Sequence, residues 1–235
     1  MKYFLILVCL LFTTLTFAQD LDDVAENFNN SGNRDRLILE LNHDNWLNGP
    51  DTVTTEWYSR GINFYFMFDA QLGTSNFSIA PGIGIGNRNL FSDVSFIEDT
   101  NETLVVPYSS TLYYPNGFDY IKNKLVTTYL DIPVELRYRT KPNSKNNSFK
   151  IAVGIKAGFL LGSHSKLKSK DQFDEARVYK VNKIRNLNKF RYGATFRVGY
   201  SEFNLIVFYG LSTLFEANKG PGINPISVGI SFNAL

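Results

Sequence analysis

The chain has 235 residues, a length that suits one domain, and nothing in its sequence marks a second. Its net charge of +2 is too small to indicate a nucleic-acid-binding protein. Aromatic residues make up 15% of the chain, which suits strands and membrane-interface belts, and no apolar stretch beyond the N-terminus is long enough for a transmembrane helix.

The N-terminus has the pattern of an export signal. Lys2 supplies the positive end, residues 3–17 form an apolar run, and cleavage is predicted after Ala18, so that residues 1–18 are the signal peptide. An uncleaved anchor is the alternative. A lipoprotein signal is excluded because Cys9 lies inside the apolar run. Cleavage after Ala18 removes this single cysteine, so no disulfide or cysteine metal site is expected.

Eight short segments follow a polar lead-in (residues 19–34) that we expect to be flexible. Each segment alternates bulky apolar residues with small or polar ones at a period of two, as in a β-strand whose two faces meet different environments. Ile62 and Phe64, for example, share one face of such a strand. The predicted strands lie near residues 36–41, 60–69, 77–85, 130–139, 150–161, 190–198, 203–209 and 226–232. Pro81 requires either a bulge or a missing ladder bond in the third strand.

Short and long connections alternate between these segments. Short turns are predicted near residues 73–74, 142–144 and 201–202, and long connections near residues 43–59, 87–123, 163–188 and 212–224. In outer-membrane barrels the short turns face the periplasm and the long loops face outward. The predicted fold is therefore all-β, an eight-stranded antiparallel up-and-down transmembrane β-barrel over residues 35–235.

Alternation alone does not say which face is inside, because a soluble lipocalin-like barrel also alternates. The apolar face carries more large side chains than an eight-stranded interior can hold, and the other face is rich in glycine, serine and both signs of charge. These features favour a membrane barrel with its apolar face outside. The residues predicted to contact lipid on one strand are Leu130, Ile132, Val134 and Leu136. An aromatic girdle is predicted from Tyr138, Phe149, Phe190, Tyr192, Tyr200, Phe203 and Phe232.

Three segments resemble the PorT-like outer-membrane β-barrel family of the Bacteroidetes. They are residues 17–19 (FAQ), residues 129–138 (YLDIPVELRY) and the glycine-punctuated residues 153–158 (VGIKAG). The resemblance implies an eight-stranded barrel in the outer membrane of a Gram-negative bacterium. It implies little chemistry, because the family is functionally mixed and some members look like accessory factors of protein secretion and gliding.

Charged residues on the polar faces of neighbouring strands are predicted to enter the lumen. They are Glu40, Glu135, Arg137, Lys150, Lys156, Arg191 and Arg197. Such charges either line a narrow ion path or form an ion-paired plug. The plug is favoured, because side chains just fill an eight-stranded barrel. Glu135 is expected to pair with Lys156, because their strands form a hairpin.

The third long connection is strongly basic. A surface cluster of this kind suits the phosphates of lipopolysaccharide. The predicted contact residues are Lys166, Lys168, Lys170, Lys180 and Lys183. A solvated loop without a ligand is the alternative, and an envelope protein partner is the third interpretation.

Signs of catalysis are weak, because His43 and His164 lie at the openings of different predicted loops and neither has a recognisable nucleophile context. No catalytic residue, cofactor or metal site is predicted. The expected function is that of a non-enzymatic outer-membrane barrel acting through its extracellular loops or periplasmic rim, in a structural, adhesive or secretion-accessory role. A small pore-forming channel is the alternative, and a barrel-embedded hydrolase or acyltransferase is third. Outer-membrane lipid is the expected partner, and nucleic acid is not.

Overall fold

A computed structural model describes most of the chain from residue 37 onward. The described ranges are residues 37–99, 101–115, 119–141, 147–170 and 173–234. The predicted signal peptide, the polar lead-in and the turn predicted at residues 142–144 lie outside them. Within these ranges, no helix is long and apolar enough to cross a bilayer.

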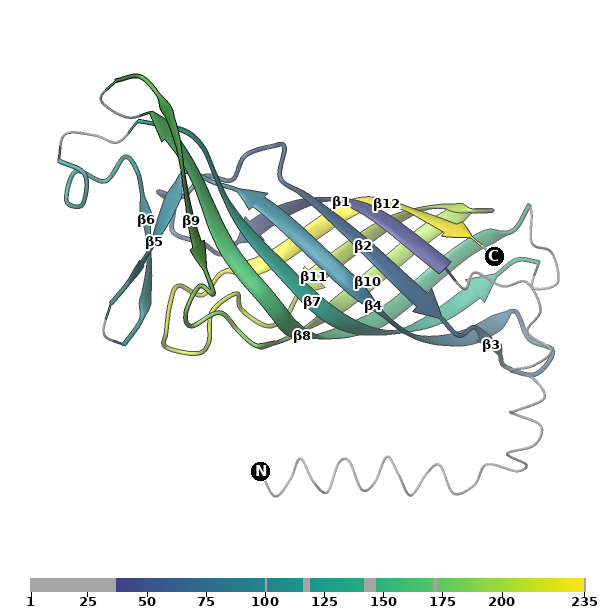
Figure 1. Cartoon of the computed structure of the whole chain (residues 1–235). Coiled ribbons are helices and arrows are strands. Elements are labelled where there is room, and N and C mark those ends of the chain that lie inside the picture. Colours follow the sequence, from purple (N-terminus) through teal and green to yellow (C-terminus); the bar gives the residue numbers. More distant parts are fainter. Residues whose placement is uncertain (1–36, 100, 116–118, 142–146, 171–172, 235) are drawn as a thin grey trace, which may run out of the picture. The chain divides into compact units, whose positions relative to one another are not determined.

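Eight strands form a closed antiparallel ring (Figure 1). They are β1 (Leu37–Leu47), β2 (Arg60–Met67), β4 (Phe77–Phe91), β7 (Tyr120–Arg139), β8 (Phe149–Lys170), β10 (Phe190–Tyr200), β11 (Phe203–Gly210) and β12 (Asn224–Ala234). The pairing of β1 with β12 and of β8 with β10 closes the ring. Closure pairs the two edges that an open sheet would leave unbonded. The predicted eight-stranded barrel is confirmed.

Four further strands lie outside the ring. They are β3 (Ala70–Gln71), β5 (Val94–Glu98), β6 (Thr103–Pro107) and β9 (Ala176–Asn182). β3 pairs with β4 at the end of the barrel that carries the short turns, here called the short-turn end. The β5–β6 hairpin and β9 belong to the connections at the opposite, long-loop end (Figure 1).

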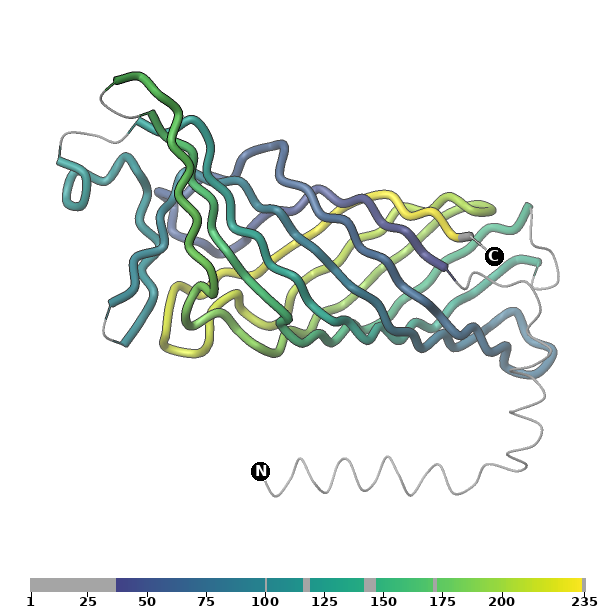
Figure 2. Tube along the Cα trace, viewed as in Figure 1, coloured from purple at the N-terminus to yellow at the C-terminus, as the bar shows by residue number. Residues whose placement is uncertain are grey.

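Two ring strands are much longer than their neighbours. β7 has 20 residues and β8 has 22, whereas β2 has 8. Residues 120–128 of β7 pair with residues 162–169 of β8, and β9 pairs with the same part of β8. A three-stranded sheet therefore continues beyond the ring at the long-loop end (Figure 2). Residues 87–91, 120–123 and 163–170, predicted as connections, are therefore strand. The regular alternation ends there because neither face meets the hydrocarbon of the membrane, so polar residues occur on both faces beside a few apolar ones.

Pro81 sits in β4 without shifting its register. It pairs with Val134, and Gly84 pairs with Asp131, so both strands advance by three residues. The proline therefore removes a ladder bond and inserts no bulge. The register shifts of this region lie instead between β7 and β8, at Tyr120/Lys122 and Thr128/Tyr129.

The outer face of the ring is apolar and the inner face is polar. Ile132, Val134 and Leu136 are 42%, 37% and 43% exposed, whereas Glu135 between them is 2% exposed. Exposed apolar residues on the other ring strands include Leu41, Ile62, Ile85, Ile155, Phe196, Leu205 and Val228. At the short-turn end the register places four aromatic residues in one row across β8, β10, β11 and β12: Phe149, Tyr200, Phe203 and Phe232. An apolar band with an aromatic row is the lipid-facing surface of a membrane barrel.

Inward-facing glycines make room for large side chains in the lumen. A Cβ at Gly84 would overlap the ring of Tyr65, and a Cβ at Gly158 would overlap the Asp131 carboxylate. Tyr65 and Asp131 are both buried. Glycine is therefore required at these positions for close approach of a neighbouring side chain.

The long connections share a small apolar core at the long-loop end. Its buried members are Leu125, Ile184, Leu187, Leu214, Phe215 and Ile223. Phe96 of the β5–β6 hairpin packs against this core, with its ring centroid 6.5 Å from that of Trp46 and 6.4 Å from that of Phe215. The connections therefore form one packed layer.

Candidate functional site

Buried ion pairs cross the lumen between opposite strands. Arg197 Nη2 on β10 lies 2.7 Å from Glu40 Oε1 on β1 and 3.1 Å from Glu135 Oε1 on β7. Arg137 Nε donates to Glu135 Oε2 at 2.9 Å. All four side chains are buried, so each charge is offset by a partner at hydrogen-bond distance. The structure thus brings together these four residues, which the sequence placed in the lumen.

Lys156 also enters the lumen, but it does not pair with Glu135 as predicted. In the β7–β8 register Glu135 faces Gly154, whereas Lys156 faces Pro133. The Lys156 ammonium donates to the Tyr65 hydroxyl at 3.0 Å and lies 4.5 Å from the centroid of the Phe208 ring. The hairpin register therefore carries the lysine past Glu135 to an aromatic environment.

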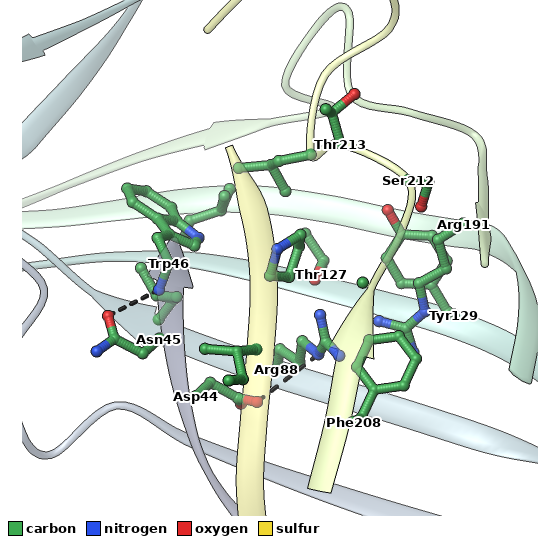
Figure 3. A pocket seen from close by; sticks show the side chains of 16 residues that line it. Asp44, Asn45, Trp46, Arg88, Thr127, Tyr129, Arg191, Phe208, Ser212 and Thr213 are labelled. Atoms are coloured by element: carbon green, nitrogen blue, oxygen red, sulfur yellow. Dashed lines mark hydrogen bonds and ion pairs between the residues drawn. The ribbon is translucent and has the colours of Figure 1, made fainter. Parts of the chain in front are cut away.

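A second ionic layer lies nearer the long-loop end. Arg191 Nη2 is 2.8 Å from Asp131 Oδ2, and its guanidinium lies 3.9 Å from the centroid of the Tyr129 ring. Arg88 Nε is 3.7 Å from Asp44 Oδ1, and its guanidinium lies over the Phe208 ring (Figure 3). The cavity that remains among these side chains is about 30 Å³, room for only a few water molecules.

A third layer closes the lumen toward the short-turn end. Asp69, just after β2, accepts from Arg137 Nη1 at 3.2 Å and also pairs with Arg139. Arg139 Nη1 donates to Ser78 at 3.2 Å. Lys150, predicted for the lumen, is buried as well. Across the described residues the lumen is therefore filled by paired side chains at three levels.

Several lumen charges were not predicted as site residues. Asp44 and Arg88 fall in segments expected to be connections, so the sequence pattern did not predict that they lie on the inner face of a strand. Asp69, Asp131 and Arg139 lie on the polar faces of predicted strands, and the alternation alone is enough to place them inside.

Neither histidine meets a nucleophile in the described residues. His43 is exposed and Asp44 is buried, because consecutive residues of β1 face opposite sides. The Ser59 hydroxyl donates to the carbonyl of Phe91 at 3.2 Å and accepts its N–H at 2.9 Å. His164 lies on the outer face of β8, where burial and then Lys180, Lys124 and Lys166 lower the pKa of its imidazole.

The predicted basic loop is mostly a hairpin of β8 and β9. In the strand register, Lys166 and Lys168 of β8 lie opposite Lys124 and Lys122 of β7. Lys180 of β9 lies opposite Lys166 on the other side of β8. The other two predicted contact residues lie elsewhere: Lys170 is held by Asp174 at 2.6 Å, and Lys183 lines a separate groove beside Leu160 and Leu161. The structure therefore gathers part of the predicted set and adds cations from β7.

Comparison with known proteins addresses the fold. The chain matches the model of the outer membrane protein beta-barrel domain family over residues 17–216. No curated protein matches the sequence. Among solved structures, the chain is similar to Ail, the attachment invasion locus protein of Yersinia pestis, in complex with the heparin analogue sucrose octasulfate, with 11% identity and a TM-score of 0.30 over 83% of this chain and 95% of that one. Because the family match covers most of the chain, from before β1 into the connection that precedes β12, this protein belongs to the outer membrane protein beta-barrel domain family.

Proposed function

We propose that this protein is a closed, non-enzymatic outer-membrane barrel whose work is done at its long-loop end, in a structural, adhesive or secretion-accessory role. The observation that carries the proposal is the filled lumen. Ion pairs cross it at three levels, around Asp69, Glu135 and Asp131, and the cavity lined by Asp44, Arg88 and Arg191 is about 30 Å³. Hydrated ions have no continuous path through such a lumen.

The distribution of ordered strand supports the long-loop end rather than the periplasmic rim. A membrane-spanning strand needs about 9–11 residues. β8 continues from Leu161, its last large exposed apolar residue in the band, for nine more residues to Lys170, which is about 30 Å of strand. At the other end β10 and β11 are joined by only Ser201 and Glu202. These features favour the long-loop end, which faces outward in barrels of this kind, as the surface that a partner contacts.

The PorT-like assignment and a role beside a secretion machinery belong to the same proposal. It is supported by the three segments that resemble the family, residues 17–19, 129–138 and 153–158. Glu135 and Arg137 are less usual in such a strand, and both enter the lumen. Export after cleavage behind Ala18 and contact with lipopolysaccharide through the outward-facing Lys166 and Lys168 of β8 complete the proposed picture.

Planar-bilayer recording of the purified barrel tests closure. The wild-type protein should give no unitary current steps. A porin in the same bilayers serves as the positive control, because the layers around Asp69 and Asp131 would still fill the lumen of a variant changed only at Glu135 and Arg197. Reproducible unitary steps in the wild type would replace the closed barrel by the small pore.

A further inference from the structure

Five cations gather on the outer wall of the barrel at the long-loop end. They are Arg60 of β2, Lys122 and Lys124 of β7, and Lys166 and Lys168 of β8, here called the outer-wall cluster. With Phe91 of β4 and Val178 of β9 they line a groove of about 350 Å³. Three of the five, Arg60, Lys122 and Lys124, lie outside the basic segment that the sequence singled out.

The strand register places like charges opposite each other in this groove. Lys122 pairs with Lys168, and Lys124 pairs with Lys166, in two consecutive positions on the same face. Like charges directly opposite across a sheet are destabilising. Two such pairs therefore act against the β7–β8 sheet unless an anion lies between them.

The cluster lies on the face of the strands that contacts lipid farther down. On β2, Arg60 is two residues from Ile62, which is 55% exposed, and this spacing is about 7 Å along the strand. On β8, Lys166 is five residues beyond Leu161, which is 59% exposed, and the register shift at Thr128/Tyr129, which leaves Leu161 without a partner, brings both side chains to the same face. The groove therefore begins at the edge of the apolar band and continues above it, where lipid headgroups lie.

None of the five cations forms an ion pair with a carboxylate of the described residues. Lys124 Nζ instead donates to Asn89 Oδ1 at 2.7 Å, and Lys122 Nζ lies 4.5 Å from the centroid of the Phe91 ring. Above the lipid-facing band, burial and then the neighbouring cations Lys166, Lys122 and Arg60 lower the pKa of Lys124. By contrast, Lys170 and Arg177 near the tip of the β8–β9 hairpin are paired with Asp174 and Glu175. The cluster therefore concentrates positive charge that no carboxylate of the described residues neutralises.

We propose that the outer-wall cluster binds the phosphate groups of a lipopolysaccharide headgroup in the outer leaflet. Lysine ammonium groups bind phosphate as point charges, and the Arg60 guanidinium adds a fork that fits phosphate oxygens. Val178, which is 54% exposed, supplies an apolar surface for the sugar or acyl part of the same molecule, and the buried Phe91 lies beneath the lysines. The position on the lipid side of the wall distinguishes a headgroup from an anion in solution. This inference deepens the proposed function and rests on it for the outward orientation of the long-loop end.

Native mass spectrometry of the full chain in detergent micelles tests the site with three probes: phosphorylated lipopolysaccharide, the same lipid dephosphorylated, and inorganic phosphate. We expect the phosphorylated lipid to be retained, the dephosphorylated lipid to bind about tenfold more weakly, and inorganic phosphate not to displace the retained lipid. Lys124→Gln/Lys166→Gln should weaken retention of the phosphorylated lipid about tenfold. The matched control, Lys170→Gln/Arg177→Gln, also removes two positive charges but leaves the groove intact, and should bind as the wild type does.

Three results would overturn the site. Equal loss of binding in the cluster variant and the control would show that binding depends only on net charge. Equal binding of the phosphorylated and dephosphorylated lipids would show that the phosphate groups are not recognised. Displacement by inorganic phosphate would make the groove a site for soluble anions. Bilayer recordings on the same variants report closure independently, because the cluster lies outside the lumen, so failure of this site and failure of the closed barrel are distinguishable.

Discussion

Val134 and Glu135 are adjacent in sequence and lie in different surroundings. The first is on the lipid side of β7 and the second is buried among arginines in the lumen. The effect of a substitution on the stability of this barrel therefore depends first on whether the position faces lipid or the lumen, which alternates along the strand, and then on its depth in the membrane. The same alternation explains why Arg60, Lys122 and Lys124 share a face with the lipid-contacting residues of their strands. On β8 the register shift beside Leu161 brings Lys166 and Lys168 to that face.

Val134→Arg should destabilise the membrane-folded barrel by about 2–4 kcal/mol, because it places a charge in hydrocarbon near the middle of the strand. Urea titration of the protein in lipid vesicles measures this change. Leu39→Arg is the control, since Leu39 is also exposed on the outer face but lies beside Phe232 in the aromatic row at the short-turn end, where the cost falls to about 0–1 kcal/mol. Equal stability of Val134→Arg and wild type would contradict the face assignment.

Glu40 and Arg197 should be strongly coupled in a double-mutant cycle. Arg197→Gln leaves the buried Glu40 without an ion-pair partner among the described residues, at a cost of about 3–5 kcal/mol. Glu40→Gln should cost less, because Arg197 keeps Glu135 as a partner, and the double variant should lose less than the sum of the two. Folding free energies in vesicles give the coupling. The exposed pair Glu216–Lys219 is the control, with an expected coupling of at most about 1 kcal/mol. Additive effects for Glu40 and Arg197 would remove the ion pair from the account of stability.

At the scale of elements, the eight ring strands follow from the sequence, but their lengths do not. Within the membrane one face meets lipid and the other the lumen, so alternation marks each strand. Above it, both faces of β7 and β8 meet water or loops, and residues such as Lys122 and Lys166 look like loop residues. The ion-pair partners were also beyond reach of the sequence. Arg197 meets Glu40 and Glu135 across the barrel, and no local spacing encodes such contacts.

Replacing residues 168–181 by a short turn should leave the barrel folded. The ring pairings of β8 with β10 run from Phe149 to Phe159, and those with β7 over the same segment remain intact. Folded-barrel mobility in SDS electrophoresis without heating checks this. The same variant should lose lipopolysaccharide retention in part, because Lys168 and Val178 are removed from the groove. Loss of the folded band would show that the β8–β9 hairpin is needed for closure.

At the scale of the whole molecule, charge is divided into two populations. The lumen charges that form ion pairs are buried, whereas the outer-wall cluster forms no ion pair with a carboxylate of the described residues and reaches solvent. Salt screens exposed charges over about 8 Å at physiological ionic strength and about 3 Å at 1 M, but acts little on buried pairs. The two populations should therefore respond differently to salt.

Raising the salt concentration should weaken lipopolysaccharide retention while the urea midpoint of the barrel changes little. Parallel measurements of retention and unfolding on one wild-type preparation check this, with the Lys124→Gln/Lys166→Gln variant expected to show a shallower salt dependence of retention. A parallel fall of both quantities would mean that the lumen pairs are open to solvent.

The apolar core shared by the long connections has a consequence for how this surface can evolve. Loops of a barrel ordinarily diverge independently, since each is tied only to its own two strands. Here Phe96, Trp46 and Phe215 come from three different connections or their borders and pack on one another. A change of length in one connection therefore disturbs the packing of the aromatic residues from the other two. Among relatives of this chain, we expect insertions to be confined to the loop tips, and substitutions at these three positions to occur together.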